Sequence, residues 1–440
     1  MTMRFLRVSA SVAVLLVLVL LASSTAASAR APGSGAHLES AVPMVAVTTK
    51  TVTVGTNPNF ALYDPATKEV YVANEGSKSV SAISSTTYAV KTITVGTEPL
   101  LITYNPTTKA LYVENFETSI SVISTANTVV KTITFPAGVF PISQAYSPAN
   151  GDVYVLCDTT TGSELVQINS ATYAQKAVVL PGAALFVTYD NASSSLVVSS
   201  PSANEVTAVS STNVATTVTL AKGFFPTWMV YNPHDSDLYI TDAGETAHGV
   251  TKTGNVSVLS SANTIIATVK VGSFPTLGWY DPANFDIYEM NTGKPSKPFP
   301  VSTVSVIGTG NTVVKTLTVG KYAAVASYDP KNSEMYIACP GSNLTYAISS
   351  GNAIVAKVVT KQYATAAEYD PKLGEMLAVG FATFFGAPVA NTLVTLIPSS
   401  NTGTSTVTLG TGPAAGGTYD PTDSGVWIVN GGTTTVSVIL

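Results

Sequence analysis

Short stretches of alternating apolar and polar residues run through the chain and return at regular intervals. Each interval is marked by a tyrosine, which is followed in most intervals by Asp or Asn and then by Pro. Strand-like segments follow the tyrosine, such as those at 71–74, 121–123 and 90–96. Alternation with a period of two predicts half-buried strands. The marker tyrosines are spaced 41 to 50 residues apart and are Tyr63, Tyr104, Tyr146, Tyr189, Tyr231, Tyr280, Tyr328, Tyr369 and Tyr419.

The turn residues agree with a sheet built from short antiparallel strands. Asp or Asn before Pro caps a turn through its side-chain oxygen while Pro fixes the following φ angle, which favours a hairpin between the first two strands. We expect the marker Asp residues to form turns and not to act in catalysis. A glycine ends the fourth strand of many repeats, where it would permit a sharp return of the backbone. Four such strands per repeat of this length are typical of one blade of a β-propeller.

The two ends of the chain indicate how the ring closes. The ninth repeat begins at Tyr419 and offers only three strands before the chain reaches Leu440. A segment of the fourth-strand type occurs at the other end, at 49–55. Pairing between a terminal strand and the last blade removes the open edge of the ring. The sequence therefore predicts an all-β protein, a single β-propeller of nine four-stranded antiparallel blades closed by an N-terminal strand, with an irregular ring of eight as the alternative.

These repeats resemble the YVTN-type β-propeller family of exported and surface-layer-associated proteins. The resemblance is carried by the Tyr-Val-Ala-Asn segment at 71–74, by the Val-Ser-Val-Ile segments, and by Gly-x-x-Pro returns such as 55–58 and 96–99. It covers about 44–440 and implies the fold, whereas a propeller fold hosts many functions.

The first thirty residues read as an export signal. Arg4 and Arg7 precede an apolar run at 12–21, and the small residues at 27–29 form an A-x-A cleavage site. An uncleaved anchor is the alternative, but the run is shorter than the roughly 20 residues that a membrane span needs. We therefore expect a secreted or cell-surface protein that has no membrane span after cleavage. The predicted parts are a signal peptide at 1–29, a short flexible linker at 30–43 and the propeller at 44–440.

Composition limits the partners. Only 11% of the residues are charged, and the formal net charge is −5. Nucleic-acid binding requires a basic surface, so we expect no nucleic-acid partner. A surface rich in Ser and Thr favours a protein or glycan partner at the cell surface, and self-assembly stays open. The sequons at Asn191, Asn255 and Asn343 are candidate glycosylation sites in an exported chain.

One mouth of the channel is the predicted binding face. In a propeller, the loops that enter the innermost strand and those that follow the second strand meet there. Three long inserts, at 242–254, 291–302 and 380–391, fall after second strands. Packing between blades is the alternative role for the aromatic residues at this mouth. The position six residues before the marker tyrosine is aromatic in five repeats, which gives the candidate ligand-binding residues Phe140, Phe225, Phe274, Tyr322 and Tyr363.

Catalytic chemistry has weak support in the sequence. His248 with Asp242 and Glu245 is the sole grouping of metal-ligand residue types, and its spacing matches no known site. The isolated acids Glu98, Glu114 and Glu289 are the other candidates. We therefore predict no catalytic residue, no metal and no cofactor.

The chain has two cysteines, and their positions decide whether they can form a disulfide. Cys157 and Cys339 occupy equivalent positions in repeats that lie nearly opposite in a ring of nine. They should be too far apart for a disulfide, which requires Cα atoms within about 7 Å. We predict two free, mostly buried thiols. The leading hypothesis for the whole chain is a non-enzymatic binding or structural protein, and the alternative is an exported lactonase- or lyase-like propeller enzyme.

Overall fold

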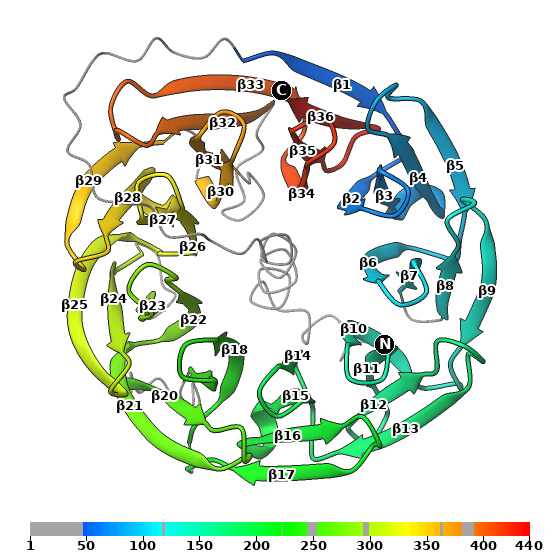
Figure 1. The fold of residues 1–440 in the computed structure, drawn as a ribbon, viewed down its shortest axis with the longest axis horizontal. Helices are drawn as coiled ribbons and strands as arrows, with labels where there is room; N and C mark the ends of the chain where they lie inside the picture. The colour runs from blue at the N-terminus through cyan, green and yellow to red at the C-terminus, as the bar shows by residue number, and fades with distance from the viewer. Residues whose placement is uncertain are drawn as a thin grey trace.

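The structure is a computed structural model, and it describes residues 47–116, 119–221, 223–243, 253–293, 299–360, 364–380 and 391–440. Nine four-stranded antiparallel sheets stand around a central channel (Figure 1). This confirms the predicted nine-bladed propeller and excludes the ring of eight. The predicted signal peptide at 1–29 and linker at 30–43, together with residues 44–46, lie outside the described residues.

Strands follow chain order from the channel outwards in every blade but the last. Blades 1 to 4 consist of β2 (Pro58–Asp64), β3 (Glu69–Asn74), β4 (Ser79–Ser84) and β5 (Val90–Thr94); β6 (Pro99–Asn105), β7 (Ala110–Asn115), β8 (Ser119–Ile123) and β9 (Val129–Thr134); β10 (Phe140–Ser147), β11 (Asp152–Asp158), β12 (Ser163–Ile168) and β13 (Gln175–Leu180); and β14 (Phe186–Asp190), β15 (Ser195–Ser200), β16 (Glu205–Ser210) and β17 (Ala215–Thr219).

Blades 5 to 8 repeat this order. They consist of β18 (Pro226–Asn232), β19 (Asp237–Asp242), β20 (Thr253–Leu259) and β21 (Ile265–Ser273); β22 (Pro275–Tyr280), β23 (Ile287–Asn291), β24 (Val301–Gly308) and β25 (Thr312–Lys321); β26 (Val325–Asp329), β27 (Glu334–Cys339), β28 (Leu344–Ser349) and β29 (Ile354–Val359); and β30 (Ala364–Asp370), β31 (Glu375–Gly380), β32 (Asn391–Pro398) and β33 (Ser405–Thr411). Three short 3-10 turns follow second strands, at η2 (Glu75–Ser77), η3 (Pro201–Ala203) and η4 (Pro340–Ser342).

The ninth blade closes the ring. It contains β34 (Ala414–Asp420), β35 (Gly425–Asn430) and β36 (Thr435–Ile439), and β1 (Thr49–Thr53) is its outermost strand. β1 pairs antiparallel with β36 from Thr49 opposite Ile439 to Thr53 opposite Thr435. The prediction that an N-terminal strand completes the last blade is therefore confirmed.

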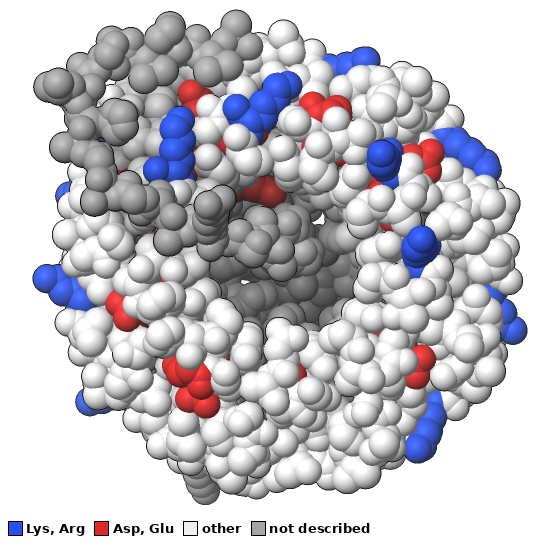
Figure 2. Space-filling model, viewed as in Figure 1, with Lys and Arg blue, Asp and Glu red and all other residues white. Residues whose placement is uncertain are grey.

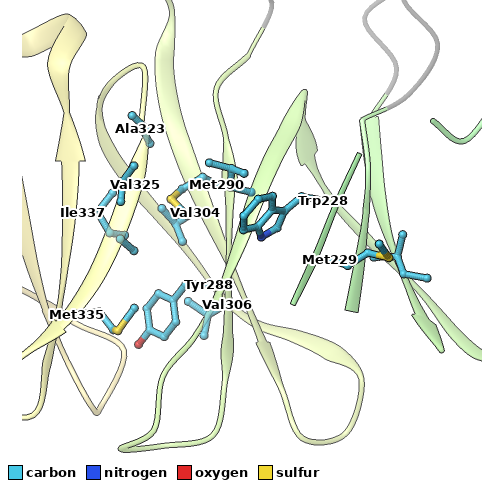
Figure 3. Close-up of a cluster of buried hydrophobic side chains, with 14 of the residues drawn as sticks. Trp228, Met229, Tyr288, Met290, Val304, Val306, Ala323, Val325, Met335 and Ile337 are labelled. Carbon is cyan, nitrogen blue, oxygen red and sulfur yellow. The ribbon is translucent and has the colours of Figure 1, made fainter. Parts of the chain in front are cut away.

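Apolar side chains fill the spaces between blades. The second strands contribute large side chains that are almost fully buried, including Tyr71, Tyr288 and Trp427. The largest cluster is continuous from blade 4 to blade 7, and Figure 3 shows part of it around Trp228 and Met290. Burial of this apolar surface is the main force that holds neighbouring blades together.

Hydrogen bonds join the blades at the end where each first strand turns into its second strand. The buried tyrosine of one blade donates its hydroxyl proton to an asparagine in the hairpin between the third and fourth strands of the next blade. The Tyr71 hydroxyl lies 2.5 Å from Asn127 Oδ1, and the Tyr239 hydroxyl lies 2.8 Å from Asn311 Oδ1. Both asparagines have left-handed φ angles, 57° and 55°. Asparagine tolerates this conformation better than most residues, which explains its place in these hairpins.

The marker Asp residues form turns, as predicted. Asp64 Oδ1 accepts a hydrogen bond from the backbone N–H of Ala66 at 2.8 Å, and Asp329 Oδ1 accepts one from Lys331 at 2.8 Å. Both carboxyls are buried. In the described part of the chain, no helix is both long and apolar enough to cross a membrane.

Candidate functional site

Two sets of loops meet at one mouth of the channel, as the sequence predicts. The backbone N–H that follows a second strand donates to the carbonyl of the residue six before the marker tyrosine of the same blade. The Ala243 N–H donates to the Phe225 carbonyl, and the Thr292 N–H donates to the Phe274 carbonyl, each at 3.0 Å. The same bond occurs in blades 1, 2 and 9, where the donor and acceptor are Glu75 and Asn57 (3.0 Å), Phe116 and Glu98 (3.0 Å), and Gly431 and Pro413 (2.7 Å). We call this mouth the loop face, and the opposite mouth, where first strands turn into second strands, the turn face.

Three of the predicted aromatic residues lie on consecutive blades of the loop face. Phe225 and Phe274 directly precede the innermost strands β18 and β22 of blades 5 and 6, and Tyr322 lies three residues before β26 of blade 7. Phe225 is 39% exposed, whereas Phe274 and Tyr322 are half-buried. Phe274 and Tyr322 both have a φ of 57°, in the left-handed region that L-residues seldom adopt. The three residues occupy equivalent positions on three consecutive blades at this mouth, and we call them the aromatic arc.

A fourth aromatic residue extends the arc. Phe299 precedes β24 and contacts Tyr322 edge-to-face, with ring centroids 5.3 Å apart. Burial raises the pKa of the Tyr322 hydroxyl to about 12, further above physiological pH than the ordinary tyrosine value of about 10. The repeat pattern did not reveal Phe299 because the residue lies in the insert at 291–302, which has no equivalent in most repeats.

The other two predicted aromatic residues are not part of this arc. Phe140 is half-buried at the start of β10 in blade 3, opposite Asp158. Blade 4 separates it from Phe225 and has Ala183 at the equivalent position. Tyr363 lies outside the described residues, as do most of the inserts at 242–254 and 380–391.

A polar sector occupies a different part of the loop face. Asn57 Nδ2 donates to Glu75 Oε2 at 3.0 Å, and Asn57 Oδ1 accepts a bond from the Gly432 backbone at 2.9 Å. The pKa of Glu75 is raised by burial and, to a smaller extent, by the charge of Glu98. The mouth is therefore polar over blades 1 and 2 and aromatic over blades 5 to 7.

The isolated acids do not converge on a common centre. Glu114 is almost fully buried in β7 of blade 2, and burial raises its pKa to about 8. Glu289 of blade 6 accepts a hydrogen bond from Thr241 Oγ1 of blade 5 at 3.0 Å, and burial raises its pKa well above the ordinary value. Glu98 is exposed on the loop face of blade 2. Glu98 and Glu114 thus belong to blade 2 and Glu289 to blade 6, where the charge of Asp242 also raises the pKa of Glu289.

Asp242 ends β19 and is buried. Ser257 Oγ donates to its Oδ2 at 2.6 Å, and burial raises its pKa to about 7. The predicted companions Glu245 and His248 lie outside the described residues. Within the described residues, no three His, Cys, Asp or Glu side chains gather in a group that could hold a metal ion.

The three sequons differ in their surroundings. Asn191 is exposed in the turn after β14, and Asn343 is exposed after η4 with a φ of 53°. Asn255 is half-buried within β20, where it pairs with Asp242 on one side and Lys270 on the other. Asn191 and Asn343 are therefore the more accessible acceptors.

The thiols match the prediction. Cys157 and Cys339 are free and buried, in blades 3 and 7 respectively. These blades lie on roughly opposite sides of the channel in Figure 1. Burial raises the pKa of both thiols, to about 12 for Cys339, which makes them poor nucleophiles.

Comparisons with known proteins support the fold alone. No family model and no curated protein sequence matches the chain. The Dos1 propeller aligns over 89% of this chain and 94% of its own, with 9% identity and a TM-score of 0.56. Dihydro-heme d1 dehydrogenase NirN, solved in complex with DHE, aligns over 69% of this chain with 11% identity and a TM-score of 0.52. This chain spans 66% of the dehydrogenase chain, and at such low identity both similarities show a β-propeller and nothing about activity.

Proposed function

We propose that this chain is an exported β-propeller of the YVTN repeat type that binds glycans at the cell surface through its loop face, without catalysing a reaction. The observation that carries the proposal is the aromatic arc of Phe225, Phe274 and Tyr322 on three consecutive blades. Aromatic rings offer large, rigid faces at low entropic cost, and such faces can stack on the apolar side of sugar rings.

The surroundings of the arc favour a neutral ligand over a charged one. Only 11% of the residues are charged, and the one face of the ring that Figure 2 shows is mostly uncharged. Tyrosine is uncharged at physiological pH, and burial raises the pKa of the Tyr322 hydroxyl further, to about 12. A ligand that gains little from charge but offers apolar ring faces and hydroxyl groups would suit this mouth. Neutral oligosaccharides have both features.

Binding and product analysis together test this function. The secreted protein would be screened against neutral oligosaccharides, and Phe225→Ala combined with Phe274→Ala should weaken binding at least about tenfold, as loss of aromatic anchors does. Val179→Ala is the matched control, because Val179 is an exposed apolar residue (81%) on the outer strand β13. If the double variant bound the oligosaccharide as tightly as the wild-type chain, that result would contradict a glycan site at the aromatic arc. Cleavage of a bound oligosaccharide would instead favour the propeller-enzyme alternative.

Export has its own test. The segment with Arg4, Arg7 and the apolar run at 12–21 supports secretion. Mass spectrometry of protein collected from the culture medium or cell surface should find a mature N-terminus at Arg30. Recovery of an intact Met1 terminus from the membrane fraction would favour the uncleaved anchor. Formation of sheets or filaments by the purified protein would add a surface-layer role.

A further inference from the structure

One turn on the turn face departs from the pattern shared by the other blades. Between its first and second strands, each blade has one residue with a left-handed φ angle of 50° to 74°. Glycine suits this conformation best because it has no Cβ to crowd. Eight blades have glycine, serine or lysine at this position, and blade 6 has phenylalanine. The residues, in blade order, are Lys68, Lys109, Gly151, Ser194, Ser236, Phe285, Ser333, Gly374 and Ser424.

Phe285 is fixed in place and open to solvent. Its ring is 39% exposed and stacks on the exposed imidazole of His234 from blade 5, with ring centroids 4.1 Å apart and an interplanar angle of 7°. Asn232 Nδ2 of blade 5 donates to the Phe285 carbonyl at 3.1 Å. The stack therefore forms a rigid aromatic platform across the boundary between blades 5 and 6. The turn does not need a phenylalanine, since serine occupies the same position in four other blades.

Carboxylates lie beside this platform. Asp235 accepts a bond from the Tyr239 hydroxyl at 2.7 Å, and Asp237 is half-buried two residues further on. Besides burial, the charges of Asp235 and Asp190 raise the pKa of Asp237, so the three acids lie within electrostatic range of one another. This sector of the turn face is therefore negative.

The balance of charge differs between sectors of the turn face. The first-to-second-strand turns of blades 1, 2, 7 and 8 each have a lysine. The corresponding turns of blades 5 and 6 have aspartates and no lysine, and the turn of blade 4 has neither. An exposed aromatic ring next to carboxylates is suited to a cation, because the ring face and the acids both attract positive charge.

We propose that the turn face over blades 5 and 6 docks a segment of a partner protein that carries lysine or arginine, with its cationic side chain over Phe285 and close to Asp235 and Asp237. This surface is separate from the loop face and does not depend on glycan binding there. A partner bound at each mouth would allow the ring to connect two components of a cell surface.

Phe285→Ser tests the proposal sharply. The substitution removes the aromatic ring, leaves the net charge unchanged, and introduces the residue that blades 4, 5, 7 and 9 have at the same turn position. Fluorescently labelled tetra-arginine and tetra-lysine peptides would be titrated against the full mature chain at low salt. We expect at least one of them to bind the wild-type chain, and Phe285→Ser to weaken that binding by about threefold to tenfold, the range expected for loss of a cation–π contact.

Phe225→Ser is the matched control, because Phe225 is also 39% exposed but lies on the loop face. It should leave peptide binding unchanged, and thermal unfolding should show that both variants are folded. If the wild-type chain and Phe285→Ser bound the peptides with equal affinity, the peptides would be held by general charge attraction and not by the Phe285 ring, which would overturn the proposal. Absence of binding to both peptides would overturn it too, as would binding of neutral oligosaccharides that depends on Phe285.

Discussion

Gly96 at the end of blade 1 leaves no room for a side chain beside Asn115 of blade 2. A methyl group on Gly96 would lie 2.6 Å from Asn115 Cγ. Asn115 Nδ2 donates to Ser121 Oγ at 2.9 Å, which fixes the amide next to the glycine. The same contact recurs where Gly55 meets Asn74. These glycines permit close approach between blades, and neither Gly55 nor Gly96 belongs to the residues with positive φ, so they serve close packing and not a left-handed conformation.

Gly96→Ala should therefore destabilise the fold. Overpacking a tight contact typically costs about 1–3 kcal/mol of unfolding free energy, and chemical denaturation would measure it. Gly310→Ala is the control, because a methyl group there would meet nothing within 4 Å. Equal stability of the two variants would show that the Gly–Asn contact is not tight. Combining Gly96→Ala with Asn115→Ala should recover part of the loss.

Glu114 makes stability depend on pH. Burial raises its pKa to about 8, so the folded state binds a proton more tightly than the unfolded state. Its contribution to stability is complete below the ordinary glutamate pKa and is lost as the pH rises towards 8.

Glu114→Gln removes this titration while preserving the size of the side chain. Urea unfolding at several pH values between 4 and 9 should show that the variant loses less stability than the wild-type chain as the pH rises. Parallel profiles for the two proteins would contradict a buried, protonated Glu114.

Spacing in the sequence predicted the propeller, its nine blades and its closing strand, because each blade repeats the same strands and turns. It also identified the loop face through Phe225, Phe274 and Tyr322. The contacts between blades were not predictable, since the Tyr71–Asn127 bond joins residues 56 positions apart. Phe285 has a detectable signal, namely an aromatic residue at a turn position where other repeats have Lys, Gly or Ser. Its stacking on a ring from the neighbouring blade does not follow from that signal, because it depends on how the two turns pack.

Lysines on the outermost strands should prevent aggregation. Lys91 in β5 and Lys131 in β9 are exposed on strands that form the outer edges of their sheets. Charged side chains on edge strands oppose pairing with other molecules. Replacing both with serine should increase light scattering at high protein concentration without lowering the melting temperature.

Lys68→Ser with Lys109→Ser is the control for this effect. It removes the same charge from the turn face, at positions where other blades already have serine. An equal increase in scattering for both double variants would assign the effect to net charge and not to the strand edges.

Both thiols should be unreactive in the folded protein. Cys157 and Cys339 are buried, and burial raises both pKa values. A thiol reagent should modify neither cysteine under native conditions and both after unfolding in denaturant, as counted by mass spectrometry. Rapid modification of the native chain, or a disulfide between the two, would contradict their assignment to opposite blades.

A comparison of the two mouths tests glycan binding by the loop face most directly. Phe225 and Phe285 are equally exposed, at 39%. Phe225 lies on the loop face and Phe285 on the turn face, at opposite mouths of the channel. Isothermal titration of a neutral oligosaccharide found by screening should show affinity reduced about tenfold or more by Phe225→Ala and unchanged by Phe285→Ser. Equal affinity of Phe225→Ala and the wild-type chain, or a loss caused by Phe285→Ser alone, would contradict a glycan site on the loop face.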